Sequence, residues 1–293
     1  MSKKKNKHRD SKPGTSGPSP LRAETGPRAA GATPSRAEAG PAPATTASKG
    51  SAIHGPVPMF YEQPRPLHLT NHADLALKTP FNYGFAAKTA AVPLVLGEFM
   101  LAAKDYPIVF APGNPPVPVA FMGLRRSENL YVERDGSWAS GTYIPAYVRR
   151  YPFLLVDATA GNRKILFVDE KSSNLTRSGG TPLIADGKPT EAVQQALKFC
   201  ETFAGDQQNT REFCEALVAH GLLENRDITV TLPDGAKLVL KDILVINPRK
   251  FEEVSDSVYL DWRKRKWLFP AYCHFQSGVN WPRLAERAGK TKA

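Results

Sequence analysis

A series of short β-rich runs between Ile108 and Asp169 restricts the fold more than any other feature of the sequence. Parallel strands need a crossover of a dozen or more residues, usually a helix, and the turn-rich links between these runs show no helical pattern. One link, Arg134-Asp135-Gly136-Ser137, is typical of a hairpin, because Asp-Gly tolerates positive φ. We therefore predict antiparallel strands. The runs are residues 108–110, 117–124, 129–133, 153–156 and 164–168.

Helical patterns lie on both sides of these strands. Pro93 suits the first turn of a helix over residues 94–104, which is apolar on most sides and is expected inside the domain. After the strands, residues 190–203 and 209–220 have helical spacing and predict a helical hairpin that ends before Gly221, with Thr190 as its N-cap.

The last part of the chain returns to strands and then to helices. Residues 228–232 alternate apolar and polar, the chain turns at Pro233-Asp234-Gly235, and strands continue to Ile246. An amphipathic helix is expected at residues 251–262 and a short helix at residues 281–287. Together these elements predict an α+β fold, an antiparallel β meander packed by several helices.

Residues 1–55 lack the apolar side chains that a core needs. They contain no Phe, Trp, Tyr or Val, and they carry ten Lys or Arg against three Asp or Glu. Such a segment cannot offset the backbone entropy that folding costs, so we predict a disordered tail at 1–55 and a single domain at 56–293. Residues 56–280 hold 25 basic and 24 acidic side chains. The basic tail therefore implies at most weak contact with nucleic acid or an anionic surface.

Cysteine usage and apolar patterning indicate a soluble cytoplasmic protein. Cys200, Cys214 and Cys273 are too few for a disulfide framework and are expected to be buried thiols. No apolar signal-peptide core follows the N-terminal lysines, and the longest apolar stretch, residues 92–103, is shorter than the roughly 20 residues of a membrane helix. Non-classical export to the cell surface is compatible with these features.

Several blocks of the sequence resemble the bacterial SapC family, which is named after a surface-layer-associated protein. The most specific block is Tyr143-Ile144-Pro145-Ala146-Tyr147-Val148-Arg149-Arg150-Tyr151-Pro152-Phe153. The resemblance covers about residues 59–285. The other blocks are Met59-Phe60-Tyr61, His72-Ala73-Asp74-Leu75, Val92-Pro93-Leu94 with Glu98-Phe99, Tyr106–Phe110, and Gly123-Leu124-Arg125 with Glu128-Asn129-Leu130.

The resemblance implies a non-catalytic binding or assembly protein with a protein partner, associated with surface-layer or envelope physiology. It also implies that the gene lies near genes for flavin-dependent tryptophan halogenases, so an accessory role in halogenation is an alternative. A peptide-transport permease subunit shares the family's name, but that protein must span the membrane. No cofactor is expected for a binding function.

The most specific block also holds the candidate binding residues. Tyr143, Tyr147 and Tyr151, together with Arg149 and Arg150, are able to stack on and clamp a planar acid or a partner's carboxylate. If the block is extended, the two arginines point to opposite sides and at most one faces a pocket. The alternative, which the sequence favours, is a structural segment whose tyrosine hydroxyls bond to the backbone.

A further alternative function is a non-haem iron oxygenase. His72, Asp74 and His274 are the residue types of the facial triad that holds iron. Such a site needs a barrel of about eight strands, which the pattern does not indicate. We expect instead that Asp74 caps a turn, that His72 is hydrogen-bonded and that no metal binds. No nucleophile elbow or phosphate-binding loop is present, so the sequence favours a protein that is not an enzyme.

The run Trp262-Arg263-Lys264-Arg265-Lys266-Trp267 places four cations between two indoles, which suits contact with nucleic acid. It also suits the end of an amphipathic helix, where the helix dipole favours cations and Trp262 lies on the buried stripe. The near-neutral middle of the chain favours the helix end.

Overall fold

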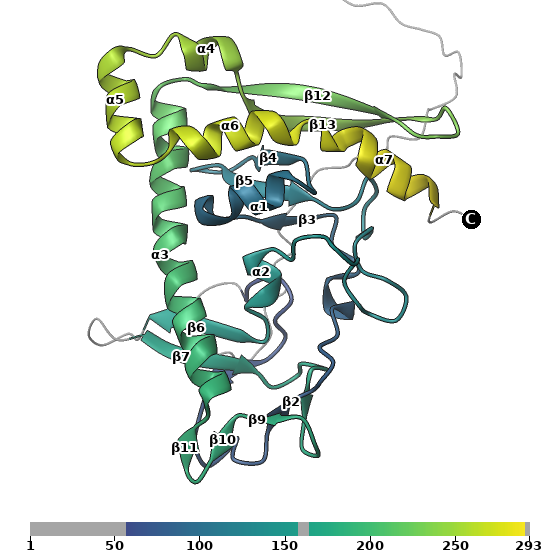
Figure 1. The fold of residues 1–293 in the computed structure, drawn as a ribbon, viewed down its shortest axis with the longest axis vertical. Coiled ribbons are helices and arrows are strands. Elements are labelled where there is room, and N and C mark those ends of the chain that lie inside the picture. Colours follow the sequence, from purple (N-terminus) through teal and green to yellow (C-terminus); the bar gives the residue numbers. More distant parts are fainter. Residues whose placement is uncertain (1–56, 158–163, 291–293) are drawn as a thin grey trace, which may run out of the picture. The chain divides into compact units, whose positions relative to one another are not determined.

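The structure, a computed structural model, describes residues 57–157 and 164–290, which form helices and antiparallel sheets (Figure 1). All of these residues belong to one structural unit, Glu38–Ala293. The predicted α+β fold is confirmed. The tail predicted at residues 1–55 lies outside the described residues, so its disorder and the domain boundary at residue 56 stay predictions.

A five-stranded antiparallel sheet carries the larger core. In spatial order, its strands are β12 (Leu223–Thr231), β13 (Lys237–Ile246), β4 (Ile108–Ala111), β5 (Val117–Phe121) and β3 (Ala91–Pro93). The hairpins β4–β5 and β12–β13 are those that the sequence predicts. They join where Leu244 pairs with Phe110, so the end of the chain completes a sheet begun in its first half.

The strands β6 (Phe153–Asp157) and β7 (Lys164–Asp169) also pair as predicted, but they lie in a different sheet from β4 and β5. Their sheet is completed by β1 (Pro64–Pro66), which pairs with β7. Short strands form two further small sheets. These are β8 (Leu175–Thr176), β2 (Ala76–Leu77) and β9 (Thr181–Pro182) in one, and β10 (Ile184–Ala185) with β11 (Lys188–Pro189) in the other.

The run at residues 129–133 does not form the predicted strand. Only Val132 bridges, to Trp138, across the predicted Asp135-Gly136 turn. Gly136 has a φ of 84°, and a Cβ at this position would overlap the side chain of Asn82. The turn therefore needs glycine for its backbone conformation and for the close approach of Asn82.

Helix α3 (Glu191–Ala219) is continuous, so the predicted helical hairpin is wrong. The two apolar stripes of this segment serve two different cores. Cys200 packs with Phe153 of the β6–β7 sheet, whereas Phe213 and Leu217 belong to the core of the five-stranded sheet. Figure 1 shows α3 running past both sheets. One long helix can therefore bury both stripes without a turn between them.

Gly205 lies inside α3, where a Cβ would meet no atom within 4 Å. Glycine costs up to about 1 kcal/mol relative to alanine in a helix interior, because it loses more backbone entropy on folding. Gly205→Ala should therefore raise the free energy of unfolding in urea by about 0.5–1 kcal/mol. Gly180→Ala is the matched control and should lower it, because Gly180 has a φ of 83° and faces Leu77 O. A less stable Gly205→Ala variant would show that α3 needs a flexible point there.

Four helices follow β13: α4 (Pro248–Glu252), α5 (Asp256–Lys264), α6 (Leu268–Ser277) and α7 (Asn280–Lys290). The single helix predicted at residues 251–262 is divided, because Ser255 is extended and starts α5 as its N-cap residue. α7 contains the short helix predicted at residues 281–287. α6 contacts β4 and β13, and α7 contacts β12, so both cover the five-stranded sheet.

The helix predicted at residues 94–104 begins later than expected, as α1 (Phe99–Ala103). Pro93 ends β3, and residues Leu96–Glu98 form a 3-10 turn. Phe99 is buried, but Met100 and Leu101 are exposed. The expectation of a fully interior helix is therefore wrong, and α1 presents an apolar side to solvent.

Candidate functional site

The block that contains the candidate binding residues includes a short helix, α2 (Ala146–Arg149), where an extended strand was considered. The buried carboxylate of Glu98 holds the start of this helix. It accepts hydrogen bonds from Tyr143 Oη at 3.0 Å and from the amides of Ala146 at 2.7 Å and Val95 at 2.9 Å. Burial raises the pKa of Glu98, and these hydrogen bonds oppose the rise. Glu98 thus ties α2 to the turn before α1.

Arg149 is the exposed arginine of the block. Its Nε donates to Ile144 O at 2.9 Å and its Nη2 to Tyr143 Oη at 2.9 Å. The guanidinium also lies 4.9 Å from the centre of the Phe199 ring, within range of a cation–π interaction. Among the described residues no carboxylate forms a direct ion pair with Arg149, although its charge and that of the nearby Glu98 carboxylate attract each other.

Arg150 lies inside the protein, with 7% of its surface exposed. Its guanidinium is 4.1 Å from the ring centre of Tyr147 and 4.8 Å from that of Phe203. Its Nε has no hydrogen-bond partner among the described residues. Aromatic faces attract this buried charge. Arg149 and Arg150 therefore have different surroundings, but the extended backbone on which our prediction of opposite sides depended is absent, because Arg149 ends a helix.

The remaining tyrosines of the block are packing residues. Tyr147 and Tyr151 are buried, and Tyr143 is half-buried. Tyr151 Oη donates to Asp169 Oδ2 at 3.1 Å, and the fully buried Asp169 also accepts from the amide of Gln63 at 2.8 Å. The hydroxyls of Tyr143 and Tyr151 thus bond to buried carboxylates and not, as the structural alternative expected, to the backbone. Arg149 is the member of the candidate set that is open to solvent.

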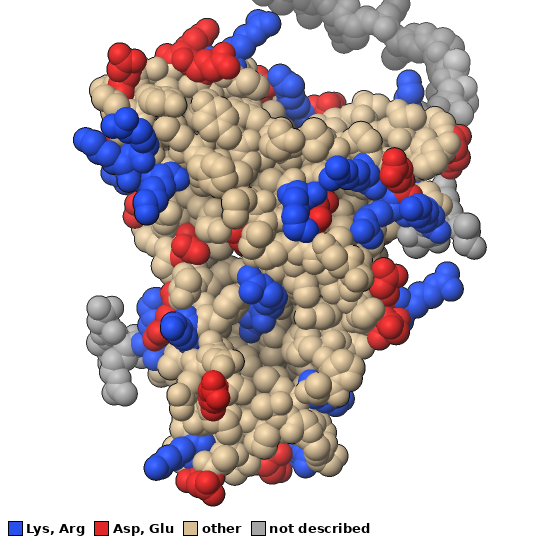
Figure 2. Space-filling model, in the orientation of Figure 1, with Lys and Arg blue, Asp and Glu red and all other residues tan. Residues whose placement is uncertain are grey.

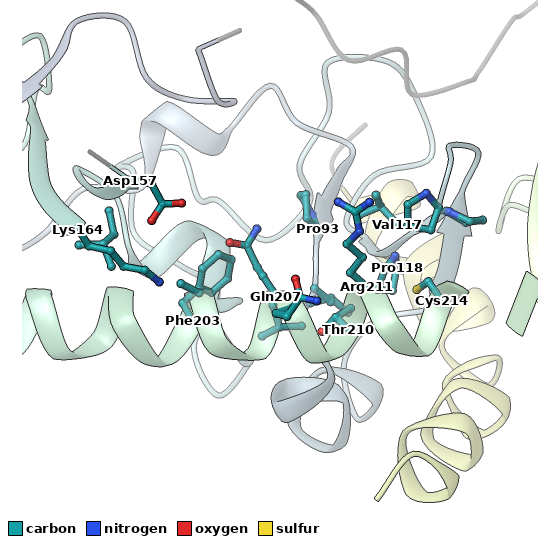
Figure 3. Close-up of a pocket in the computed structure, with 17 residues that line it drawn as sticks. Pro93, Val117, Pro118, Asp157, Lys164, Phe203, Gln207, Thr210, Arg211 and Cys214 are labelled. Carbon is teal, nitrogen blue, oxygen red and sulfur yellow. The ribbon is translucent and has the colours of Figure 1, made fainter. Parts of the chain in front are cut away.

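A cleft of about 570 Å³ lies next to this block (Figure 3). Phe203 forms part of its wall and also packs on Arg150. Figure 3 shows Asp157 and Lys164 at one end, Arg211 at the other and Gln207 between them. The cleft is lined by residues of α3, of the β6–β7 hairpin and of the chain around β3 and β5. It therefore combines apolar walls with a mixed set of charges at its ends.

The cysteines near this cleft are poor nucleophiles. All three cysteines are buried, as predicted. Burial raises the pKa of Cys214, which lines the cleft, to about 12 and that of Cys200 to about 11. A reactive cysteine requires a thiolate, and both thiols stay protonated at neutral pH. The cleft thus suits binding better than thiol chemistry.

The structure does not bring the three candidate iron ligands together as a site. His72 accepts from the amide of His68 through Nδ1 and contacts Glu170 Oε1 through Nε2, while Asp74 forms an ion pair with Arg177. Within residues 57–157 and 164–290, no group of three His, Cys, Asp or Glu side chains could hold a metal ion. The hydrogen-bonded His72 is as predicted, whereas Asp74 forms the ion pair in place of the predicted turn cap.

His274 lies on α6 between β4 and β13 and uses both ring nitrogens there. Nε2 accepts from the amide of Ile246 at 3.1 Å, so the proton is on Nδ1, which donates to Ile108 O at 2.8 Å. Burial lowers the pKa of His274 to about 4, although the hydrogen bond to Ile108 opposes this change. His274 is thus a neutral link between two strands.

Iron binding at these residues is therefore expected to fail. After anaerobic incubation with ferrous iron and desalting, the full chain should retain far less than one iron per chain, because both nitrogens of His274 are already engaged. His72→Ala should leave this value unchanged, as measured by elemental analysis. One iron per chain that is lost in both His72→Ala and Asp74→Ala would contradict the expectation.

The basic run between Trp262 and Trp267 lies at the end of helix α5. The sequence favoured this interpretation over a nucleic-acid contact, because the middle of the chain is nearly neutral. Both indoles are buried, so they cannot stack on nucleic-acid bases. Trp267 Nε1 donates to Asn209 Oδ1 at 2.8 Å. Arg265 pairs with Asp261 and lies over the Trp267 ring. The cations of the run remain at the surface, at the junction of α5 and α6.

A surface that the sequence did not point to lies over α1 and α6. We call it the apolar face, and its members share an exposed fraction of at least 42%. They are Met100, Leu101, Phe269, Tyr272 and Val279. Four of them, Met100, Phe269, Tyr272 and Val279, line a groove of about 720 Å³ together with Phe275 and other residues. Figure 2 shows the front of the molecule in this region as largely uncharged.

The sequence does contain an apolar periodicity at this face, but the same pattern is typical of a buried helix side. Phe269, Tyr272, Gln276 and Val279 recur at spacings of three and four residues, which places them along one side of α6. Apolar periodicity normally marks the buried side of a helix. Here α6 also buries Ala271, His274 and other residues on its opposite side, so both of its sides are rich in apolar and aromatic groups.

These observations define an α+β protein with a packed aromatic and arginine cluster, an open cleft and an exposed apolar face. Within the described part of the chain, no helix is long and apolar enough to cross a membrane. The SapC family model matches residues 67–284, so the chain belongs to the SapC family, in agreement with the resemblance of its sequence blocks. No curated protein and no solved structure matches the chain.

Proposed function

We propose that this SapC-family chain is a non-catalytic binding protein whose protein partner docks on the apolar face. The observation that carries the proposal is the exposure of Met100 and Phe269, each 58% exposed, which line one groove together with the exposed Tyr272 and Val279. Burying one such side chain gains about 1.5–3 kcal/mol. Contiguous apolar surface of this kind is typical of an interaction site.

Catalysis has weaker support among the described residues. The cysteine thiols are buried, and an oxygenase would require His72, Asp74 and His274 to leave their present partners. An accessory role in halogenation and an association with the cell envelope follow from the family resemblance alone. Arg149 is a second candidate contact, because its exposed guanidinium forms no direct ion pair with a carboxylate in the described part of the chain.

The proposal is tested by identifying what contacts the apolar face in the producing cells. A photoreactive amino acid at Tyr272 should give a defined cross-linked product, which mass spectrometry identifies and which is then purified and titrated with the full chain. Met100→Glu and Phe269→Glu should each weaken binding of that partner by about tenfold or more, because a charge would be buried in the contact. Arg149→Ala should weaken it less.

The matched control is Val239, which is 42% exposed on β13, where its neighbours Leu238 and Leu240 pack toward the core. A photoreactive group at Val239 should give no such product, and Val239→Glu should leave the affinity unchanged. If position 272 gives no more product than position 239, or if the partner binds Phe269→Glu at full affinity, the apolar face is not the docking surface.

A further inference from the structure

We infer that the partner segment that fills this groove is an amphipathic helix with acidic residues toward both of its ends, an inference that rests on the protein-binding function proposed above. The groove is concave and is bordered by α1 and α6. A groove between helices suits the apolar side of a partner helix, which inserts side chains at helical spacing. A bilayer would instead favour apolar side chains that protrude from a convex surface.

The apolar stripe gives the length of the partner helix. Phe269, Tyr272 and Val279 lie along one side of α6 and its C-terminal end. At 1.5 Å per residue, the distance from Phe269 to Val279 along the helix is about 15 Å. A partner helix of about three turns, with apolar residues three and four positions apart, covers this length.

Uncompensated cations lie where α6 begins. The run of residues 263–266 ends α5 and directly precedes α6. Arg265 is paired with Asp261 and Glu212. Arg263 and Lys264 are exposed and form no ion pair with any carboxylate in residues 57–157 and 164–290. This end of the stripe therefore carries net positive charge.

The other end of the stripe is also positive. Arg283 borders the groove, and its Nη1 donates to Lys104 O at 3.2 Å and to Asn280 Oδ1 at 3.1 Å. Both acceptors are uncharged, and no described carboxylate pairs with Arg283. Lys104 lies beside it and is paired with Asp105. Figure 2 shows basic side chains toward both sides of the largely uncharged region.

The acidic residues at the two ends of the stripe are paired with Arg265 and Lys104, and a further acidic group lies beside its middle. Glu252 is on α4 and is one of the charges that raise the pKa of Tyr272, after burial and the neighbouring Tyr259. A partner with acidic residues in its centre would meet this carboxylate. Charge complementarity therefore favours a helix with an apolar middle and acidic ends.

The test uses two blocked, fluorescein-labelled peptides of about three helical turns with the same leucine stripe. One peptide carries Glu at both ends, and the other carries Lys. In fluorescence anisotropy titrations with the full chain, the acidic peptide should bind about tenfold more tightly than the basic one, since several exposed charge pairs contribute. The difference should disappear at an ionic strength of about 1 M, where the screening length is about 3 Å.

Variants connect this preference to the structure. Lys264→Glu and Arg283→Glu should each reduce the preference for the acidic peptide, whereas Lys198→Glu, an exposed charge reversal on α3, should not. Lys264→Glu is the cleaner of the two variants, because the side chain of Arg283 also makes hydrogen bonds. Phe269→Glu should abolish binding of both peptides, and Val239→Glu should leave it unchanged.

The outcomes separate this inference from the proposed function. Equal binding of both peptides, or tighter binding of the basic one, contradicts the inference of a partner helix with acidic ends. The proposed docking on the apolar face is not contradicted by that result. The inference also fails if neither peptide binds and Phe269 is instead needed for another contact. That contact could be binding to vesicles of anionic lipid, or formation of a dimer of this chain as measured by sedimentation equilibrium. If neither peptide binds and position 272 gives no cross-linked product, the inference and the proposed function both fail.

Discussion

Glu98→Ala should lower the free energy of unfolding by about 4 kcal/mol, because the variant leaves two buried amides and one half-buried hydroxyl without their acceptor. These donors are Tyr143 Oη and the amides of Val95 and Ala146, all of which bond to the Glu98 carboxylate. Urea unfolding followed by circular dichroism measures the loss. For a domain of this size, the melting temperature should fall by about 10 °C.

Two variants show whether the hydrogen bonds are responsible. Glu98→Gln keeps the shape of the side chain, but its NH₂ group replaces one of the two acceptor oxygens and faces another donor. One oxygen still accepts hydrogen bonds, so the free energy of unfolding should fall by less, about 2 kcal/mol. Met100→Ala, on the exposed side of α1, should change the stability by no more than about 0.5 kcal/mol. A loss below about 1 kcal/mol in Glu98→Ala would mean that water replaces the carboxylate.

The stability of the protein should also fall in mild acid because of His274. Its pKa is lowered to about 4 in the folded protein, from an ordinary value of 6.5. Between pH 6.5 and pH 4, His274 therefore binds a proton in the unfolded chain but not in the folded one. This contribution is fully present above pH 6.5 and is lost as the pH falls toward 4. Between pH 8 and pH 5, the loss due to His274 should be about 2 kcal/mol.

His274→Ala tests this expectation in two ways. At pH 8 it should be less stable than the natural protein, because the amide of Ile246 and the carbonyl of Ile108 lose their partner. Between pH 8 and pH 5, it should lose about 2 kcal/mol less than the natural protein. His220→Gln, at an exposed histidine, should keep the natural pH dependence. If His274→Ala keeps it as well, another group causes the acid sensitivity.

Local signals in the sequence predicted much of the fold. The alternation at residues 228–232 and the Asp-Gly turn at 234–235 lead to the hairpin β12–β13. The Asp135-Gly136 turn is also present, although its flanking strands are not. The spacing of residues 190–220 gave the helix type correctly, but not its continuity. Whether Gly205 ends a helix depends on two cores that both need α3, and a local pattern contains no information on them.

The arrangement of the candidate site could not be predicted, because its contacts join distant segments. Glu98 and Tyr143 both belong to blocks that resemble the SapC family, yet only the folded chain shows that their side chains meet. The sequence predicted that at most one of Arg149 and Arg150 faces a pocket if the block is extended, but it did not show which one. Their difference in burial depends on the position of Phe203, which comes from α3. Each of these features is decided by tertiary packing.

The pairing of β13 with β4 has a consequence for the order in which the chain is made. β4 and β5 are synthesised long before β13. The edge of β4 that pairs with β13 therefore stays unpaired until β13 has been made. Unpaired strand edges recruit other chains, and incomplete folding intermediates aggregate for this reason. A nascent or prematurely terminated chain that ends before α6 also lacks His274, which bonds to both Ile108 and Ile246. We therefore expect the free edge of β4 to be prone to aggregation during synthesis until β13 and α6 have emerged.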